Sequence, residues 1–267
     1  MEKEIGNLLH DGGTGRMLSL TENVVAVLGM VGISLALFVV MDRVWSWDKR
    51  TQHNDVTGWQ LGILGTTYAV ILGFMLYAVW TDFDTATQNV EMEANSLTNL
   101  YRLAEGLPDG SRVELQKLAR EYAEKVIQND WPEMDQGRTP VESVGLASKM
   151  QRVLISVPEA SRTAGVAQDH AMTELSAMTT CRRTRLLENA LSLPTVLWFV
   201  LVVGGVLTIV SSCMFGSQNR FLHGVQVVFF SLMIALALLA IADINKPFRG
   251  SVHVSDAAFV RALENMK

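Results

Sequence analysis

Residues 59–80 read WQLGILGTTYAVILGFMLYAVW and contain no charged side chain. Because an α-helix rises ~1.5 Å per residue, a helix of this length crosses a hydrocarbon layer of ~30 Å, and an aromatic residue stands at each end, as is typical of membrane spans. Apolar positions at helical spacing continue beyond Trp80, and no proline occurs between Gly58 and Leu107. We therefore predict one helix over residues 58–107 that crosses a membrane and projects beyond it.

Three more segments, residues 23–41, 195–214 and 222–242, carry no Asp, Glu, Lys or Arg and are long enough to cross a bilayer. Between Thr81 and Leu193, no stretch alternates with the period of two that a half-buried strand requires. The predicted fold class is therefore all-α: a four-helix transmembrane protein with a helical cytoplasmic bundle built on the long second helix.

The chain divides into five predicted segments: an N-terminal arm (1–22), the first two transmembrane helices with their linker (23–80), a helical cytoplasmic domain (81–193), the last two transmembrane helices (194–243) and a C-terminal tail (244–267). Four crossings place both termini and the helical domain on one side of the membrane. That side holds 18 of the 22 Lys and Arg residues, with two in the arm, 12 in the helical domain and four in the tail. The positive-inside rule then predicts that this side is the cytoplasm, and we expect a multi-pass protein of the bacterial inner (plasma) membrane.

Within the helical domain, two capping-box patterns predict helix starts, at Ser111 with Glu114 and at Thr139 with Glu142. A further helical stretch, from about residue 160 to residue 189, returns to the membrane. We thus expect the long outgoing helix to pack with two shorter helices and one returning helix.

Several classes of function are not indicated. The chain has no His-Glu-x-x-His motif, no nucleophile elbow and no Walker loop, so we predict no catalytic residue, no cofactor and no metal site. The net charge of −5 provides no basic surface for a nucleic acid. The expected partners are the lipid bilayer, inorganic ions and further copies of the same chain.

Small residues line two neighbouring rows of the second helix in its membrane part. They are Gly58, Gly62, Gly65, Ala69 and Gly73. Small side chains let helices approach closely in lipid, where no hydrophobic effect drives helices together. Two alternatives stay open: packing between transmembrane helices of one chain, or the gathering of several copies around a symmetry axis.

Glu93 falls on the apolar stripe of the long helix, where a charge is costly unless it is paired or hydrated. It could form an ion pair or hydrogen bond inside the bundle, lie exposed to solvent, or belong to a ring of carboxylates around a hydrated axial pathway. Asp82, Asp84 and Glu91 make the segment next to the membrane acidic. Such a segment would favour cations in the vestibule of a pore, or it is simply an exposed acidic surface of the helix.

Asp243 stands at the C-terminal end of the fourth transmembrane segment, where the helix dipole disfavours a negative charge. We expect a basic partner to compensate it. Arg249 is the candidate, with Lys246 and the group Arg182, Arg183 and Arg185 as alternatives.

Short motifs occur throughout the chain: His53-Asn54 with Gly58; LGILGTTYAVILGF at residues 61–74 with Trp80; Glu91, Glu93-Ala94 and Leu97; Tyr122 with Trp131-Pro132; Leu197-Trp198; Gly204-Gly205; and DINKPFRGSV at residues 243–252. Together they resemble the bestrophin-like family of uncharacterised membrane proteins, from about residue 42 to the C-terminal end. The resemblance implies kinship with bestrophins, which are oligomeric ion channels whose pore is lined by a membrane helix that continues into a cytosolic neck. Animal bestrophins pass anions, whereas the corresponding segment here is acidic, so anion selectivity does not carry over.

The first functional hypothesis is an oligomeric bestrophin-like ion channel, a tetramer or pentamer with a preference for cations. Thr66, Thr67, Phe74 and Tyr77 are the expected pore-lining residues in the membrane, and Glu93 is the expected cytosolic ring. The alternative is a non-conducting membrane sensor or scaffold whose cytoplasmic bundle binds a partner protein. A transporter is less favoured, because none of the four apolar segments contains an internal charge or a proline kink.

Overall fold

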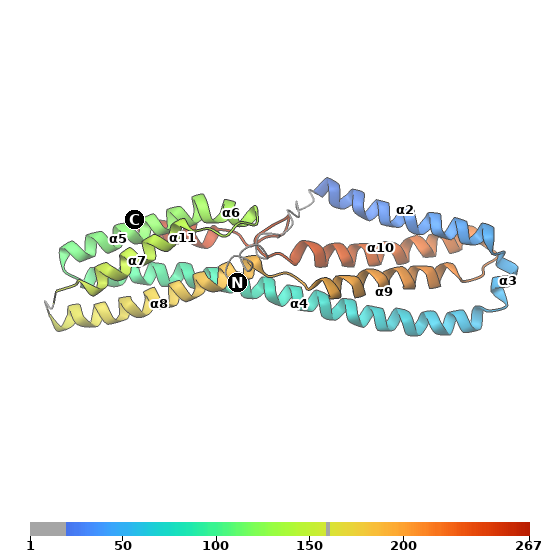
Figure 1. Cartoon of the computed structure of the whole chain (residues 1–267), viewed down its shortest axis with the longest axis horizontal. Coiled ribbons are helices and arrows are strands. Elements are labelled where there is room, and N and C mark those ends of the chain that lie inside the picture. The colour runs from blue at the N-terminus through green and yellow to red at the C-terminus, as the bar shows by residue number, and fades with distance from the viewer. Residues whose placement is uncertain (1–19, 159–160) are drawn as a thin grey trace, which may run out of the picture.

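The computed structural model describes residues 20–158 and 161–267, and in these residues every regular element is a helix. The elements are α2 (Leu20–Val44), α3 (Trp47–Thr51), α4 (Asn54–Leu103), η1 (Ala104–Gly106), α5 (Asp109–Lys125), η2 (Val126–Asp130), α6 (Trp131–Asp135), α7 (Glu142–Ile155), α8 (Arg162–Ala190), α9 (Thr195–Cys213), α10 (Arg220–Ile244) and α11 (Ala257–Asn265). They form an elongated molecule with two halves, and α4 runs through both (Figure 1). Of the predicted N-terminal arm, residues 1–19 lie outside the described residues.

Helix α4 has 50 residues and is about 75 Å long at ~1.5 Å per residue. It confirms the prediction of one helix that crosses the membrane and continues beyond it, because no proline interrupts its backbone hydrogen bonds. It begins earlier than predicted, at Asn54, and passes after Leu103 into the 3₁₀ turn η1. Helices α9 and α10 pack against its first half, and α5, α8 and α11 pack against its second half.

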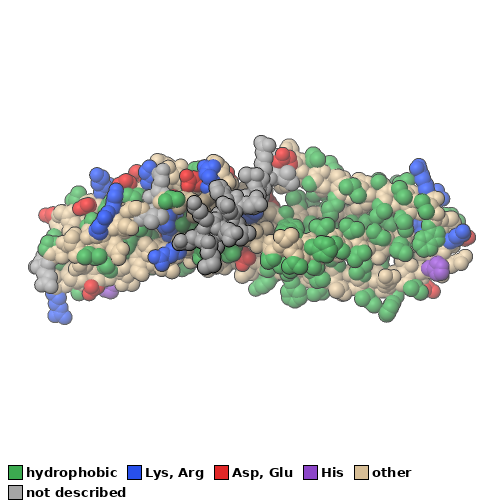
Figure 2. Space-filling model, viewed as in Figure 1, with side chains coloured by type: hydrophobic (Ala, Val, Ile, Leu, Met, Phe, Trp, Pro, Cys, Tyr) green, Lys and Arg blue, Asp and Glu red, His purple; other side chains and the backbone are tan. Residues whose placement is uncertain are grey.

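Four helices of the described chain are long and apolar enough to cross a membrane: α2, α4, α9 and α10. Hydrophobic side chains cover the half of the molecule that contains α2, α9 and α10, whereas charged side chains gather mainly over the other half (Figure 2). The apolar surface of the half with α2, α9 and α10 is too large to be stable in water and suits a lipid environment. The predicted fold class, a four-helix transmembrane protein with a helical domain built on the second spanning helix, is confirmed.

Tyr68 joins α4 to α9 inside the membrane half. Its hydroxyl donates a hydrogen bond of 2.8 Å to the carbonyl oxygen of Leu201. Its ring occupies the space where a side chain at Gly204 would lie, 2.6 Å from the position of the missing Cβ. The Gly204-Gly205 pair therefore lets a large aromatic side chain of α4 contact the backbone of α9.

The distal end of the spanning helices, which is the end farthest from the helical domain, is held by polar contacts. Arg50 of α3 is 1% exposed; it donates a hydrogen bond of 2.8 Å to the carbonyl oxygen of Cys213 and forms an ion pair with Asp42. Asn54 and Gly216 exchange two hydrogen bonds, each of 2.8 Å. These contacts tie the α2–α4 connection to the turn between α9 and α10.

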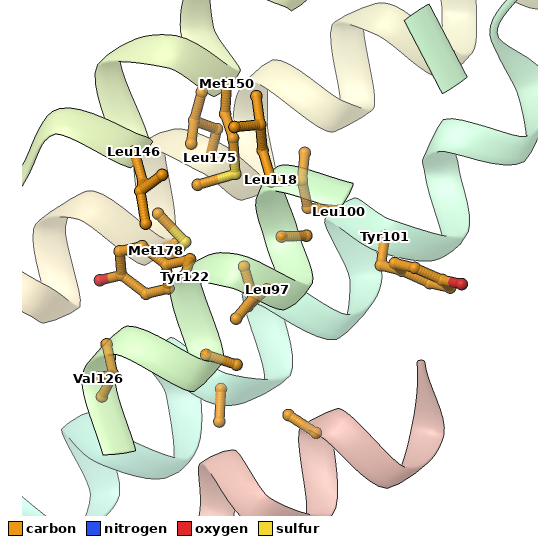
Figure 3. Packing of buried hydrophobic residues seen from close by; sticks show 14 of the residues in the cluster. Leu97, Leu100, Tyr101, Leu118, Tyr122, Val126, Leu146, Met150, Leu175 and Met178 are labelled. Atoms are coloured by element: carbon orange, nitrogen blue, oxygen red, sulfur yellow. The ribbon is translucent and has the colours of Figure 1, made fainter. Parts of the chain in front are cut away.

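The helical domain has its own hydrophobic core, in which α4 and α8 face α5 and α7. Leu97 and Leu100 of α4 pack with Leu118 and Tyr122 of α5, with Leu146 and Met150 of α7, and with Leu175 and Met178 of α8 (Figure 3). Helix α11 closes the core, since its Phe259 is fully buried. Burial of each large apolar side chain contributes about 1.5–3 kcal/mol, so this half can hold α4 in one orientation.

The two predicted capping boxes do not form. Helix α5 begins at Asp109, after Pro108, so Ser111 lies inside its first turn. Helix α7 begins at Glu142 with Val141 as its N-cap, two residues later than the box at Thr139 predicts. Helix α8 does begin with a side-chain cap: the Ser161 hydroxyl accepts a hydrogen bond of 3.1 Å from the backbone of Ala164.

The close approach at Gly216 leads to a prediction. A Cβ atom there would lie 2.4 Å from the backbone nitrogen of Thr51 and 2.7 Å from the carbonyl oxygen of Trp47, which are main-chain atoms that cannot rotate away. Gly216→Ala should therefore lower the free energy of unfolding by about 1–3 kcal/mol. Gly32→Ala in α2, where nothing lies within 4 Å of the new atom, is the control and should not lower it. The midpoint of thermal unfolding in detergent measures both, and equal midpoints would contradict the close contact.

Candidate functional site

One face of α4 has no partner among the residues that the structure describes. We define the outward face of α4 by six exposed residues: Thr66, Gly73, Tyr77, Asp84, Gln88 and Asn95. They follow one another at steps of seven and four residues, which are close to two turns and one turn of a helix. The buried residues Tyr68, Val79, Ala86, Val90 and Leu97 keep the same spacing on the opposite side. The outward face thus runs without a break from the membrane half into the helical half.

The four residues predicted to line a pore in the membrane lie at the surface of the chain. Thr66 and Tyr77 belong to the outward face, and Tyr77 is 69% exposed. Thr67 and Phe74 are also exposed but lie to one side of it, since each residue turns the helix by about 100°. Their role as pore-lining residues stays a prediction.

The small residues of α4 differ in what surrounds them. A Cβ atom at Gly62, Gly65 or Gly73 would have no other described atom within 4 Å, so none of the described helices packs closely there. Ala69 is exposed as well. Gly58 alone of the four glycines has a neighbour, because a Cβ atom there would lie 3.4 Å from the ring of Phe215. Close packing within one chain therefore accounts for Gly58 and leaves the other positions available to another copy or to lipid.

Glu93 does not lie on the outward face, and the expectation of a Glu93 carboxylate ring is wrong. The side chain is 0% exposed. Its carboxylate accepts hydrogen bonds of 2.8 Å and 3.1 Å from the guanidinium of Arg185 and one of 2.6 Å from the hydroxyl of Tyr122. Because Glu93 lies on the apolar stripe, its side chain points into the core of the domain. The structure therefore confirms the alternative of an ion pair inside the bundle.

The ion pair of Glu93 belongs to a larger buried network. Arg185 also donates a hydrogen bond of 3.1 Å to Asp130, and its guanidinium lies 5.2 Å from the centre of the Trp131 ring. Asp130 accepts a further hydrogen bond from Ser143, which accepts one from Arg182. Two arginines thus balance two carboxylates, and the network joins α4, η2, α7 and α8.

Burial and charge shift the pKa values of two members of the network, Arg185 and Tyr122. Burial lowers the pKa of Arg185, but the adjacent Glu93 carboxylate outweighs burial, so the pKa of Arg185 is raised and its guanidinium stays charged. Burial and the negative charge of Glu93 raise the pKa of Tyr122 well above its usual value, so its hydroxyl remains a proton donor.

From the sequence, Arg185 is predicted only to be a positive charge near the membrane. The spacing of Arg182 and Arg185, one helical turn apart, was the signal that both could face the core.

The expected pairing of Asp243 with Arg249 is also wrong. Asp243 accepts a hydrogen bond of 2.6 Å from the hydroxyl of Ser251, because the chain turns back at Gly250, whose φ is 92°. Arg249 instead donates hydrogen bonds to the carbonyl oxygens of Met134 and Asn189, at 3.2 and 3.4 Å. Arg249 therefore attaches the segment after α10 to the helical domain.

The chain is similar to known proteins over most of its length. A family model described as a Bestrophin-like domain matches residues 28–259. Two crystal structures of a bacterial bestrophin homologue from Klebsiella pneumoniae, each with a point mutation, have TM-scores of 0.70 and 0.69 at 13% and 11% sequence identity, and each match covers 90% of this chain and 97% of the other. A third structure, a membrane protein variant, has a TM-score of 0.71 at 12% identity with the same coverage. No curated protein sequence matches. The likeness to these structures shows a common fold.

The buried network predicts a large effect of Glu93→Gln. The change removes a carboxylate charge and leaves Arg185 with incomplete compensation in the core, so the free energy of unfolding should fall by about 3–5 kcal/mol. The matched control is Glu114→Gln on the exposed surface of α5, where we expect a change within about 0.5 kcal/mol. The double variant Glu93→Leu, Arg185→Met should lose less than the single variants Glu93→Leu and Arg185→Met added together, because neither charge of this pair is left buried without the other. Thermal unfolding compares these five variants with the wild type, and additive losses would contradict the ion pair.

Proposed function

This chain belongs to the bestrophin-like family, and on that premise we propose that it assembles into an oligomeric ion channel whose pore is lined by the outward face of α4. The observation that carries the proposal is the unbroken exposed stripe on a helix that crosses the membrane and continues through the helical domain. When several copies surround an axis, the same face of each copy points inward. Four or five copies of α4 would then enclose a path along most of the length of the molecule.

Exposed threonine and tyrosine hydroxyls support this use of the membrane part of α4. In lipid, a polar side chain at the surface is costly unless it is satisfied, whereas beside a hydrated pore it is not. The Thr66 hydroxyl donates to the carbonyl oxygen of Gly62, at 2.7 Å, so it is the acceptor lone pairs of its oxygen that would gain from water in a pore. We propose Thr66 and Tyr77 as the central lining residues and Thr67 and Phe74 as lining residues beside them.

We further propose that the channel prefers cations and that Asp84 supplies the charge. From Asn54 to Tyr101, α4 contains no Lys or Arg. Glu93 is neutralised by Arg185, and Glu91 forms an ion pair with Arg261 of α11. Asp84 lies on the outward face, one helical turn beyond Trp80, accepts a hydrogen bond of 2.7 Å from Gln88 and forms no ion pair among the described residues. A ring of such carboxylates at the pore would attract cations and repel anions.

The proposed orientation is that of a bacterial inner-membrane protein with the helical domain and both termini in the cytoplasm. It rests on the excess of Lys and Arg on that side of the four spanning helices. Labelling of cysteines introduced on either side of the membrane in intact cells tests the orientation independently of ion conduction.

Asp84→Asn tests the selectivity. The wild-type protein in liposomes with a KCl gradient should set a potential close to that of potassium, and Asp84→Asn should shift it toward zero because the attraction of cations by the ring is lost. Glu114→Gln, an exposed carboxylate on α5, is the control and should leave the potential unchanged. A folded, oligomeric wild-type protein that conducts no ion would reject the channel and favour the sensor or scaffold.

Tyr77→Ala tests the position of the pore. Removal of an aromatic ring from the narrow membrane part of the pathway should increase single-channel conductance, while selectivity set by Asp84 should persist. Phe199→Ala is the matched control: Phe199 lies on α9 and is 67% exposed, against 69% for Tyr77, yet it is not on α4. Planar-bilayer recordings compare the three proteins. An increase in conductance with Phe199→Ala and none with Tyr77→Ala would place the pore elsewhere.

A further inference from the structure

A groove of about 760 Å³ lies between α4 and α10 in the membrane half, with α9 as its floor. Its volume falls within the range of about 300–1,000 Å³ that is usual for small-molecule sites. Gly65 and Ala69 form part of the α4 wall. Because neither residue has a large side chain, the space between the two helices stays unfilled there. The groove is separate from the outward face of α4, since Gly65 points about 100° away from Thr66.

The length and position of the groove match one leaflet of a bilayer. Its lining extends from Leu61 to Leu72 on α4, about 17 Å, and from His223 to Ala237 on α10, about 21 Å, at ~1.5 Å per residue. Half of a hydrocarbon layer of ~30 Å is ~15 Å. Leu61 lies two turns from Asn54, which is hydrogen-bonded at the distal end. The groove therefore starts near the distal membrane surface and ends near the middle of the membrane.

The chemistry of the groove changes along this length. Its inner part is lined by apolar side chains such as Leu72, Phe230 and Met233, whereas its polar residues lie toward the distal end. Among those, Thr208 donates to the carbonyl oxygen of Gly204, and a ring nitrogen of His223 lies 3.1 Å from the carbonyl oxygen of Ser212. The side chains of Gln226 and Ser212 form no hydrogen bond within the described part of the chain. Unpaired polar groups at this depth favour a ligand that brings its own polar atoms.

We propose that the groove between α4 and α10 binds a phospholipid of the distal leaflet, with one acyl chain along the apolar part and the ester region at Gln226 and Ser212. The surroundings of a spanning helix bundle consist of such lipids, and the apolar length, the polar end and the orientation of the groove all correspond to half a lipid bilayer. The binding does not depend on ion conduction.

The test uses the full chain in vesicles of phosphatidylethanolamine and phosphatidylglycerol that contain a small fraction of phosphatidylcholine with a diazirine at the end of one acyl chain. After illumination and proteolysis, mass spectrometry locates the attached lipid. In the wild-type protein, we expect labels on α4 and α10 near Leu72, Met233 and Ala237. Gly65→Leu should abolish those labels by filling the groove, and Gly32→Leu on α2, which also has open space, should leave them unchanged.

A second pair of variants tests the polar end. Gln226→Leu should reduce the phospholipid that stays bound through purification, as counted by native mass spectrometry, whereas Gln60→Leu, an exposed glutamine on α4 outside the groove, should not. The same spectra report the number of protein copies. If Gly65→Leu separates the copies while the labelling of each chain persists, the groove is a contact between copies and the proposal is wrong. Labels that are absent from the wild-type groove, or that Gly65→Leu does not change, also overturn it.

Discussion

The buried ion pair of Glu93 and Arg185 determines how α4 is oriented. An unpaired charge in the core of the helical domain would cost several kcal/mol, so α4 cannot rotate by even one residue, about 100°, without losing this pair. Tyr122 adds a third hydrogen bond to the same carboxylate, and Arg185 in turn contacts Asp130. Residues half a turn away from Glu93, such as Asp84 and Asn95, are consequently kept on the outside.

The orientation set in the helical domain extends into the membrane because α4 is continuous. A continuous helix without a proline kink keeps the angular order of its faces along its length, so the outward position of Asp84 also implies the outward position of Tyr77 and Thr66. At the distal end, the hydrogen bonds between Asn54 and Gly216 and the contacts of Arg50 hold the beginning of the same helix. Both ends of α4 are thus attached to the rest of the chain by polar contacts.

Between these ends, packing around α4 is uneven. On the side of α9, glycines accept the ring of Tyr68, and the two helices are close. On the side of α10, Gly65 has no neighbour and a groove remains. Small residues therefore have opposite consequences in the same membrane half, depending on whether a large side chain of the facing helix fills the space that they leave. This is why the row of small residues in α4 could not be interpreted from spacing alone.

The sequence by itself determined the helices and their class. Four uncharged segments of sufficient length, the absence of proline in α4 and the lack of strand periodicity were enough, because these properties act locally or through the thickness of the membrane. The apolar stripe even contained the information that Glu93 faces the core. Only the tertiary structure decided which side chains contact the carboxylates: the charged Arg185 for Glu93, and the neutral Ser251 rather than Arg249 for Asp243. Partners that lie far apart in the chain meet through the packing of whole helices, and no local pattern specifies that geometry.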